Sequence, residues 1–199
     1  MDAETMQLLS ALLALFAVGG TAVLLVARAV AGRSALAGSF VEGVRPLALP
    51  LAFAVSGFAM FGSLWFSESA NYNPCRLCWY QRTMMYPLAV VTLVALVRRG
   101  LLRTSASQRE VTPYALVLAA IGAVISGYHY IVEWYPTLES NVCAIDVPCT
   151  TIWFREFGFV TLPFMALCGF VSIIILLSTT YPRSSDTAMS DTPMESEQS

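Results

Sequence analysis

Residues 79–97, WYQRTMMYPLAVVTLVALV, decide the fold, because most of their side chains are apolar. A helix needs roughly 20 such residues to cross about 30 Å of hydrocarbon. Four further stretches of this character run approximately over residues 7–31, 46–66, 113–132 and 159–181. Inside lipid the backbone must satisfy its own hydrogen bonds, so each stretch is expected to be a helix. The sequence therefore predicts an all-α integral membrane protein with five spanning helices.

The composition agrees with this prediction. Of the 199 residues, 57% are hydrophobic and only 12% are charged, whereas a soluble domain carries about 25% charged residues. All 11 cationic residues are arginine, and the net charge is only -2. This small charge, together with the lack of any recognisable nucleic-acid-binding motif, argues against a nucleic-acid partner.

Arginine placement predicts the orientation, because short arginine-rich loops stay in the cytoplasm. The connections after the first and third segments carry Arg28, Arg33, Arg45, Arg98, Arg99, Arg103 and Arg109. The connections on the opposite side mix arginine with acidic residues and contain four cysteines. We therefore expect a multi-pass protein of the cell membrane, with the N-terminus and both cysteine loops outside and the C-terminus cytoplasmic.

A Cys-x-x-Cys motif, NPCRLC at residues 73–78, directly precedes the stretch quoted above. Pro74 stands where a helix could begin, so Cys75 and Cys78 fall in or near its first turn. The positive end of the helix dipole favours a thiolate there, and a Cys-x-x-Cys arrangement with a nearby arginine has the same effect. Arg82 lies four residues after Cys78, on the same helical face and one turn deeper.

An arginine inside a membrane segment is costly unless it faces a partner or a polar cavity. For Arg82, a thiolate or the carbonyl of a bound electron acceptor would be such a partner. The alternative is that the side chain extends to the lipid headgroups. We favour the interpretation that Arg82 faces a thiolate or a bound electron acceptor.

The second pair, Cys143 and Cys149, brackets the sequence CAIDVPC in the outer loop before the last segment. Closing so short a loop is entropically cheap, so an intraloop disulfide forms easily. A short, exposed disulfide is also easily attacked by another thiolate. Two pairs on one side of a membrane can therefore pass a disulfide between them, and the outer compartment is where disulfides persist.

Two other readings of the four cysteines compete with redox work. A zinc site would require all four thiolates to converge tetrahedrally, and no histidine stands beside them in the sequence. Both pairs could also be static disulfides in a structural or transport protein. We prefer thiol redox chemistry because the first pair falls in or near the first turn of a helix, with Arg82 one turn further along the same face.

These motifs resemble the disulfide bond formation protein B family, abbreviated DsbB. PCRLCWYQR before an apolar helix is followed by GYHY near the end of the next helix, by Cys-x5-Cys and by GFVTLPFMAL, in that order. The resemblance covers roughly residues 46–181 and is greatest to the short-loop, BdbC-like branch. It implies a four-helix thiol:quinone oxidoreductase that supports protein disulfide formation.

The resemblance also implies a partner and an acceptor. A thioredoxin-fold thiol oxidase of the DsbA or BdbD type would be reoxidised outside the membrane, and two electrons would pass to a membrane quinone of the ubiquinone or menaquinone type. Carried over by position, Cys78 would be the thiolate facing the quinone, with Cys75 as its exchanging neighbour. Arg82 would hold the quinone carbonyl. Cys143 would form the mixed disulfide with the partner and Cys149 would relay to Cys75, although exchanging these two roles leaves the reaction unchanged.

The first segment has no counterpart in the four-helix core that the resemblance implies. It lacks the positive n-region of a signal peptide, and we expect a retained helix. The predicted organisation is an extra N-terminal transmembrane helix with its cytoplasmic connection over residues 1–45, the bundle over 46–181 and a disordered cytoplasmic tail over 182–199. A vitamin K epoxide reductase-like enzyme is the alternative within the same chemistry, but in those proteins the Cys-x-x-Cys follows the loop cysteines.

His129 is the only histidine. It is either a quinone or proton ligand, as the resemblance favours, or an interfacial residue among belt aromatics. Cys168, inside the last segment, is expected to be a small apolar residue between helices. Glu133 and Glu139 are expected to be solvated loop carboxylates.

Overall fold

The computed structural model describes residues 2–102, 106–139, 143 and 147–180. Within these ranges the chain forms helices and one isolated bridge, between Glu156 and Val160, but no strand. The helices are α1 (Ala3–Val30), α2 (Ala35–Val44), η1 (Arg45–Leu47), α3 (Ala48–Glu68), α4 (Arg76–Leu102), α5 (Ala106–Trp134), η2 (Pro136–Leu138) and α6 (Leu162–Ser178). The predicted all-α class is confirmed, whereas the predicted tail of 182–199 lies outside the described residues.

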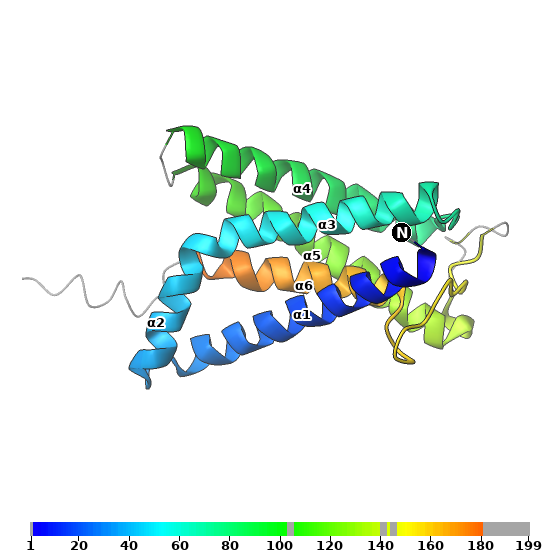
Figure 1. Cartoon of the computed structure of the whole chain (residues 1–199), viewed down its shortest axis with the longest axis horizontal. Coiled ribbons are helices and arrows are strands. Elements are labelled where there is room, and N and C mark those ends of the chain that lie inside the picture. The colour runs from blue at the N-terminus through cyan, green and yellow to red at the C-terminus, as the bar shows by residue number, and fades with distance from the viewer. Residues whose placement is uncertain (1, 103–105, 140–142, 144–146, 181–199) are drawn as a thin grey trace, which may run out of the picture.

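Helices α3, α4, α5 and α6 form a bundle, and α1 lies along its outer side against α6 (Figure 1). Polar contacts join α1 to α6 at two levels. The Thr21 and Ser172 hydroxyls lie 3.3 Å apart, and Arg28 donates to the Ser178 hydroxyl over 3.3 Å. The predicted four-helix bundle with one additional N-terminal helix is therefore confirmed.

Four helical stretches in the described part of the chain are long and apolar enough to cross a membrane, namely Ala3–Val30, Ala35–Glu68, Arg76–Gly100 and Glu110–Trp134. The fifth, α6, has only 17 residues, which is the lower end of the spanning range. It begins later than the predicted 159–181 because the chain first turns back on itself. Phe157 and Gly158 have φ values of 52° and 79° there, a backbone conformation that glycine adopts without strain.

The structure contains helix in places where the sequence predicted connections between spanning segments. Arg98 and Arg99 lie inside α4, because arginine is a good helix former and the backbone bonds continue past the apolar stretch. Arg99 donates to the carbonyl of Pro46 over 2.9 Å. The first connection contains α2, a helix that we did not predict, whose N-cap Ser34 accepts the backbone N–H of Ala37 over 3.5 Å.

Close packing between α5 and α6 sets the centre of the bundle. The fully buried Phe170 ring packs so closely on Gly122 that a Cβ at this position would clash with it. Small residues let membrane helices approach in this way. Between α3 and α4 the buried Ser56 and Thr92 hydroxyls lie 3.3 Å apart. This packing fixes the positions of α3, α4, α5 and α6 relative to one another, including the ends that carry the cysteines.

The chain runs back and forth so that its N-terminus, the start of α4 and the loop between α5 and α6 share one end of the bundle (Figure 1). The connection through α2, the end of α4 and the start of α5 lie at the other end. Both cysteine pairs therefore belong to the same end of the molecule as the start of α1.

Candidate redox site at the mouth of the bundle

The Cys-x-x-Cys pair stands at the N-terminus of α4. Cys75 directly precedes the helix and Cys78 lies in its first turn. Their Sγ atoms are 3.0 Å apart and unbonded, so a small movement closes a disulfide. Because the helix begins at Arg76, its unpaired backbone N–H groups and its dipole favour negative charge on the sulfurs.

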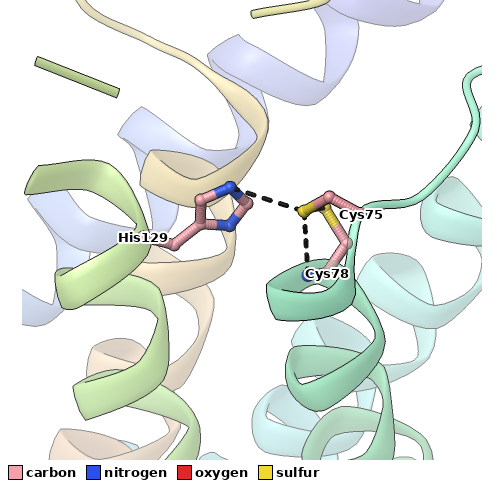
Figure 2. A group of neighbouring side chains, drawn as sticks. All are labelled: Cys75, Cys78 and His129. Carbon is pink, nitrogen blue, oxygen red and sulfur yellow. Dashed lines mark hydrogen bonds between the residues drawn. The ribbon is translucent and has the colours of Figure 1, made fainter. Parts of the chain in front are cut away.

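Hydrogen-bond donors converge on Cys75. The backbone N–H of Cys78 donates to Cys75 Sγ over 3.3 Å, and the Nε2 of His129 lies 3.7 Å from it. Figure 2 shows the imidazole reaching from α5 toward the two sulfurs at the start of α4. The pKa of the Cys75 thiol is lowered from 9.0 to about 4, chiefly by the hydrogen bond from the Cys78 thiol, and further by His129, against the raising effect of burial. Reduced Cys75 is therefore a thiolate at neutral pH.

His129 is buried and held on both ring nitrogens. Its Nε2 lies 3.0 Å from the carbonyl oxygen of Cys149, which can only accept, so this nitrogen carries the proton. In the neutral ring Nδ1 is then an acceptor, and the Gln81 amide donates to it over 3.0 Å. The Nε2–H therefore points between the loop backbone and the Cys75 sulfur.

The loop pair is joined, as the sequence predicted: Cys143 and Cys149 form a disulfide. Cys149 is fully buried and packs with Cys75 in one apolar cluster, while Cys143 is only partly buried at its edge. The carboxylate of Glu139 accepts the backbone N–H of Cys149 over 2.9 Å. The loop disulfide is thus held next to the Cys-x-x-Cys pair, and its two sulfurs differ in accessibility.

Arg82 is half-buried and turns toward α3. Its Nε donates to the hydroxyl of Ser63 over 2.8 Å, and its Nη2 donates to the Ser63 carbonyl over 2.9 Å. The Trp79 ring centroid lies 5.2 Å from the guanidinium carbon, within cation–π range. Sequence reasoning found the arginine but missed Ser63, because a lone serine in an apolar stretch gives no signal of its function.

Arg82 and Cys78 border a cavity of about 420 Å³ between α1, α3, α4 and α6. Most of its walls are apolar, including Phe58, Met85, Met165 and Phe170, and the polar groups of Cys78, Gln81 and Arg82 belong to α4. Trp153, from the loop before α6, also lines the cavity and stacks on Tyr72 at 4.7 Å between ring centroids. Largely apolar cavities with a few polar groups are typical of small-molecule sites.

The expectation that Glu133 is a solvated loop carboxylate is wrong. It lies in α5, one turn after His129, is only 7% exposed, and accepts a hydrogen bond of 2.6 Å from Thr161. The helix continues past the predicted segment end and carries Glu133 inward. A small second cavity connects Cys75, Cys78, His129 and Glu133. Cys168 is buried in α6 and packs as an apolar residue, as expected.

The fold also brings a histidine to the first cysteine pair, although the absence of a histidine beside the cysteines in the sequence had argued against zinc. The ligand atoms of Cys75, Cys78 and His129 lie within 4.8 Å of one another. Structural zinc sites use four protein ligands, and this cluster of described residues offers three. A disulfide between Cys75 and Cys78 would remove two of them.

Fold and site together define a helical, multi-pass membrane protein that carries two adjacent cysteine pairs at one end of its bundle. Residues 45–180 match the family described as "Disulfide bond formation protein DsbB", and the chain belongs to this family. The match begins after α1 and α2.

Several curated proteins are similar to this chain. The "Probable disulfide formation protein C 2" of Bacillus anthracis is 37% identical over 134 residues, which cover 67% of this chain and 90% of that protein. The "Disulfide bond formation protein C" of Bacillus subtilis (strain 168) is 40% identical over 126 residues, 63% of this chain and 86% of that protein. A "Probable disulfide formation protein C" of Halalkalibacterium halodurans is 42% identical over 118 residues, 59% and 80% respectively. No solved structure gives a significant match.

Proposed function

We propose that the protein is a thiol:quinone oxidoreductase that reoxidises a thioredoxin-fold dithiol protein and delivers its electrons to a membrane quinone. The observation that carries this proposal is the position of Cys75 and Cys78. They lie between the loop disulfide on one side and the cavity that Arg82 borders on the other. A dithiol in that position is suited to relay electrons from a protein outside the bilayer to a lipid-soluble acceptor within it.

The partner's attack is expected at Cys143. A partner thiolate forms a bond to Cys143 Sγ, the bond to Cys149 breaks, and Cys149 leaves as a thiolate. The partner's second thiolate then displaces Cys143, so the partner is oxidised and the loop pair is reduced. Exposure supports this order, because Cys149 is fully buried whereas Cys143 is not, and exchange requires access to the attacked sulfur.

The loop pair then reduces the Cys-x-x-Cys pair. Cys149 attacks Cys75, a bond forms between them, the Cys75–Cys78 bond breaks, and Cys78 leaves as a thiolate beside the cavity. Cys143 next attacks Cys149, which restores the loop disulfide and releases Cys75. The arrangement described above, with the loop pair joined and the inner pair open, is the one expected at the end of this exchange. The hydrogen bonds on Cys75 stabilise it as the leaving thiolate.

The residues around the cavity fit a quinone. Its volume of about 420 Å³ lies within the usual range for small-molecule sites, and its walls are mostly apolar. When the Cys75–Cys78 disulfide forms again, the pair gives up two electrons, and a bound quinone would take up these electrons together with two protons. The Arg82 guanidinium, held by Ser63, provides fixed positive charge for the acceptor's oxygen, and such preorganised charge stabilises developing negative charge. His129 holds a proton next to Cys75.

We further propose that the cysteine end of the bundle faces outward. The arginines at the opposite end support this orientation by the positive-inside rule. Four of them, Arg28, Arg45, Arg98 and Arg99, lie at the ends of α1, η1 and α4. A partner with a thioredoxin fold would then meet the loop disulfide in the oxidising compartment.

The test is to purify the protein with lipid, add a reduced thioredoxin-fold dithiol protein, and follow quinone absorbance. Cys78→Ser should abolish turnover, because the inner pair can no longer form a disulfide. Arg82→Ala should raise the quinone KM. Cys168→Ser, in the same bundle but away from both pairs, is the matched control and should behave as wild type. Equal turnover in all variants would overturn the proposal.

A further inference from the structure

Helix α1 forms one wall of the cavity that Arg82 borders. Five of its residues line that cavity: Ser10, Leu13, Ala14, Phe16 and Ala17. The match to the DsbB family begins at residue 45, after α1 has ended. The cavity is therefore completed by an element that lies outside the family match, which makes the chemistry of this wall a property of this chain.

One polar side chain on that wall lacks a partner. The hydroxyl of Ser10 is buried, its residue is only 7% exposed, and the oxygen has no hydrogen bond among the described residues. Several other helical serines and threonines bond to a carbonyl three or four residues earlier, among them Thr21, Ser56 and Thr92. A buried hydroxyl without a partner is costly, and Ser10 is one of the residues that line the cavity.

The side chains of Ser63, Tyr72, Gln81, Arg82 and Tyr86, which also line the cavity, each have at least one hydrogen-bond partner within the protein. Ser63 accepts from Arg82, Gln81 donates to His129, Tyr72 accepts from Gln7, and Tyr86 donates to Ser63. Among the described lining residues, Ser10 is thus the one with a buried hydroxyl that has no hydrogen-bond partner of either kind.

Two contacts in the turn before Ser10 hold this part of α1 in place. The amide of Gln7 donates to the Tyr72 hydroxyl over 2.6 Å, and Tyr72 lies three residues before the first cysteine. The terminal carbon of the adjacent Met6 lies 3.9 Å from a Cβ position at Gly62 in α3. These contacts hold the first turns of α1 against the end of the bundle that carries the cysteines.

We propose that Ser10 donates a hydrogen bond to a ring oxygen of the bound quinone, so that α1 is part of the acceptor site. The inference rests on the proposed function. A quinone ring has two carbonyl oxygens that only accept and no donor. The cavity offers matching donors on two walls, the Arg82 guanidinium on α4 and the Ser10 hydroxyl on α1. Ser10 is a binding residue that sets affinity and orientation, and no proton transfer is assigned to it.

The experiment uses the full chain in lipid nanodiscs, freed of endogenous quinone, with a short-tailed quinone labelled with ¹³C at each carbonyl in turn. Infrared difference spectra report hydrogen bonding at each carbonyl, and quenching of tryptophan fluorescence gives the Kd. The variants are Ser10→Ala, Ser10→Thr, Arg82→Ala and Ser126→Ala. Ser126 carries the other buried hydroxyl found without a partner in the described residues, but it does not line the cavity, so it is the matched control.

We expect the wild type to show both carbonyl bands shifted to lower frequency. Ser10→Ala should restore one band to its unbonded frequency and weaken binding roughly fivefold, the effect of one hydrogen bond. Arg82→Ala should restore the other band. Ser10→Thr, which keeps a hydroxyl, and Ser126→Ala should both resemble wild type. Alanine is a strong helix former, so Ser10→Ala is expected to keep α1 intact.

The outcomes distinguish failure of the role of Ser10 from failure of the proposed function. If the wild type binds the quinone and Ser10→Ala leaves both bands and the Kd unchanged, the role of Ser10 is refuted while the proposed function stands. If Ser10→Ala weakens binding without altering either band, Ser10 only packs, and the inference is again refuted. If the wild type binds no quinone, both the proposed function and the role of Ser10 are refuted.

Discussion

The Nε2 of His129 lies 3.7 Å from the Sγ of Cys75, and the same nitrogen lies 3.0 Å from the carbonyl oxygen of Cys149. One imidazole thus contacts the sulfur of the inner pair and the backbone of the loop pair. Because that carbonyl can only accept, the ring presents a proton to both. This relationship links the acidity of Cys75 to the position of the loop.

The first prediction concerns the charge of reduced Cys75. Its pKa is lowered to about 4 by the Cys78 hydrogen bond and by His129, so the thiolate should persist through neutral pH. Thiolate ultraviolet absorbance of the reduced protein should stay constant between about pH 6 and 8 and fall as the pH approaches about 4. The Cys75 thiolate also stabilises the folded protein at high pH, and this stabilisation is lost as the pH falls through the lowered pKa. Cys75→Ser should lack this transition, and a transition near pH 9 in the wild type would contradict the prediction.

The second prediction removes the imidazole. His129→Ala deletes a donor to Cys75, so the pKa of Cys75 should rise toward its ordinary value and the absorbance transition should move to higher pH. The loop should also loosen, because the Cys149 carbonyl loses its partner, and amide exchange of residues 147–151 should quicken. Gln81→Ala, which leaves Nε2 in place, should shift the transition less. An unchanged transition in His129→Ala would show that the 3.7 Å contact has no influence on the thiolate.

The third prediction uses the unequal burial of the loop sulfurs. In Cys149→Ser, the accessible Cys143 should capture an oxidised thioredoxin-fold partner as a mixed disulfide. In Cys143→Ser, the remaining thiol of Cys149 is fully buried, and capture should be at least tenfold slower. Non-reducing electrophoresis followed by peptide mass analysis measures both. Faster capture by Cys143→Ser would reverse the order of exchange proposed here.

The fourth prediction concerns the packing of α5 on α6. A Cβ at Gly122 would clash with the Phe170 ring, and Phe170 is fully buried. Gly122→Ala should therefore destabilise the bundle by about 1–3 kcal/mol, as overpacking of a core does. Gly127→Ala, in the same helix but with open space around its Cβ, is the control. Thermal unfolding in detergent compares the two, and equal melting temperatures would contradict the prediction.

Composition and local spacing were enough to predict the class of protein, the spanning segments and the disulfide between Cys143 and Cys149. Each of these depends on residues close together in the sequence. The position of the Cys-x-x-Cys pair at a helix start also followed from local signals, with Pro74 before it and an apolar stretch after it. Helix α2 did not, because its arginine-flanked sequence has no spanning length.

Contacts between distant residues could not be predicted in the same way. Ser63 is separated from Arg82 by 19 residues, and its hydroxyl is one of several in apolar helices. Glu133 was expected in solvent because the apolar stretch seemed to end before it, yet α5 continues and Thr161 covers the carboxylate. In both cases the partner comes from another helix or loop, and only the packing of the bundle selects it.

The docking of Cys149 against His129 has a kinetic consequence. When two cysteine pairs are joined by a long flexible segment, the rate of exchange between them is limited by how often that segment brings them together. Here both pairs belong to one packed cluster, so the proposed cycle needs no such search. We therefore expect binding or release of the proposed thioredoxin-fold partner to be the slowest event, and turnover should vary with the partner's concentration and with solvent viscosity.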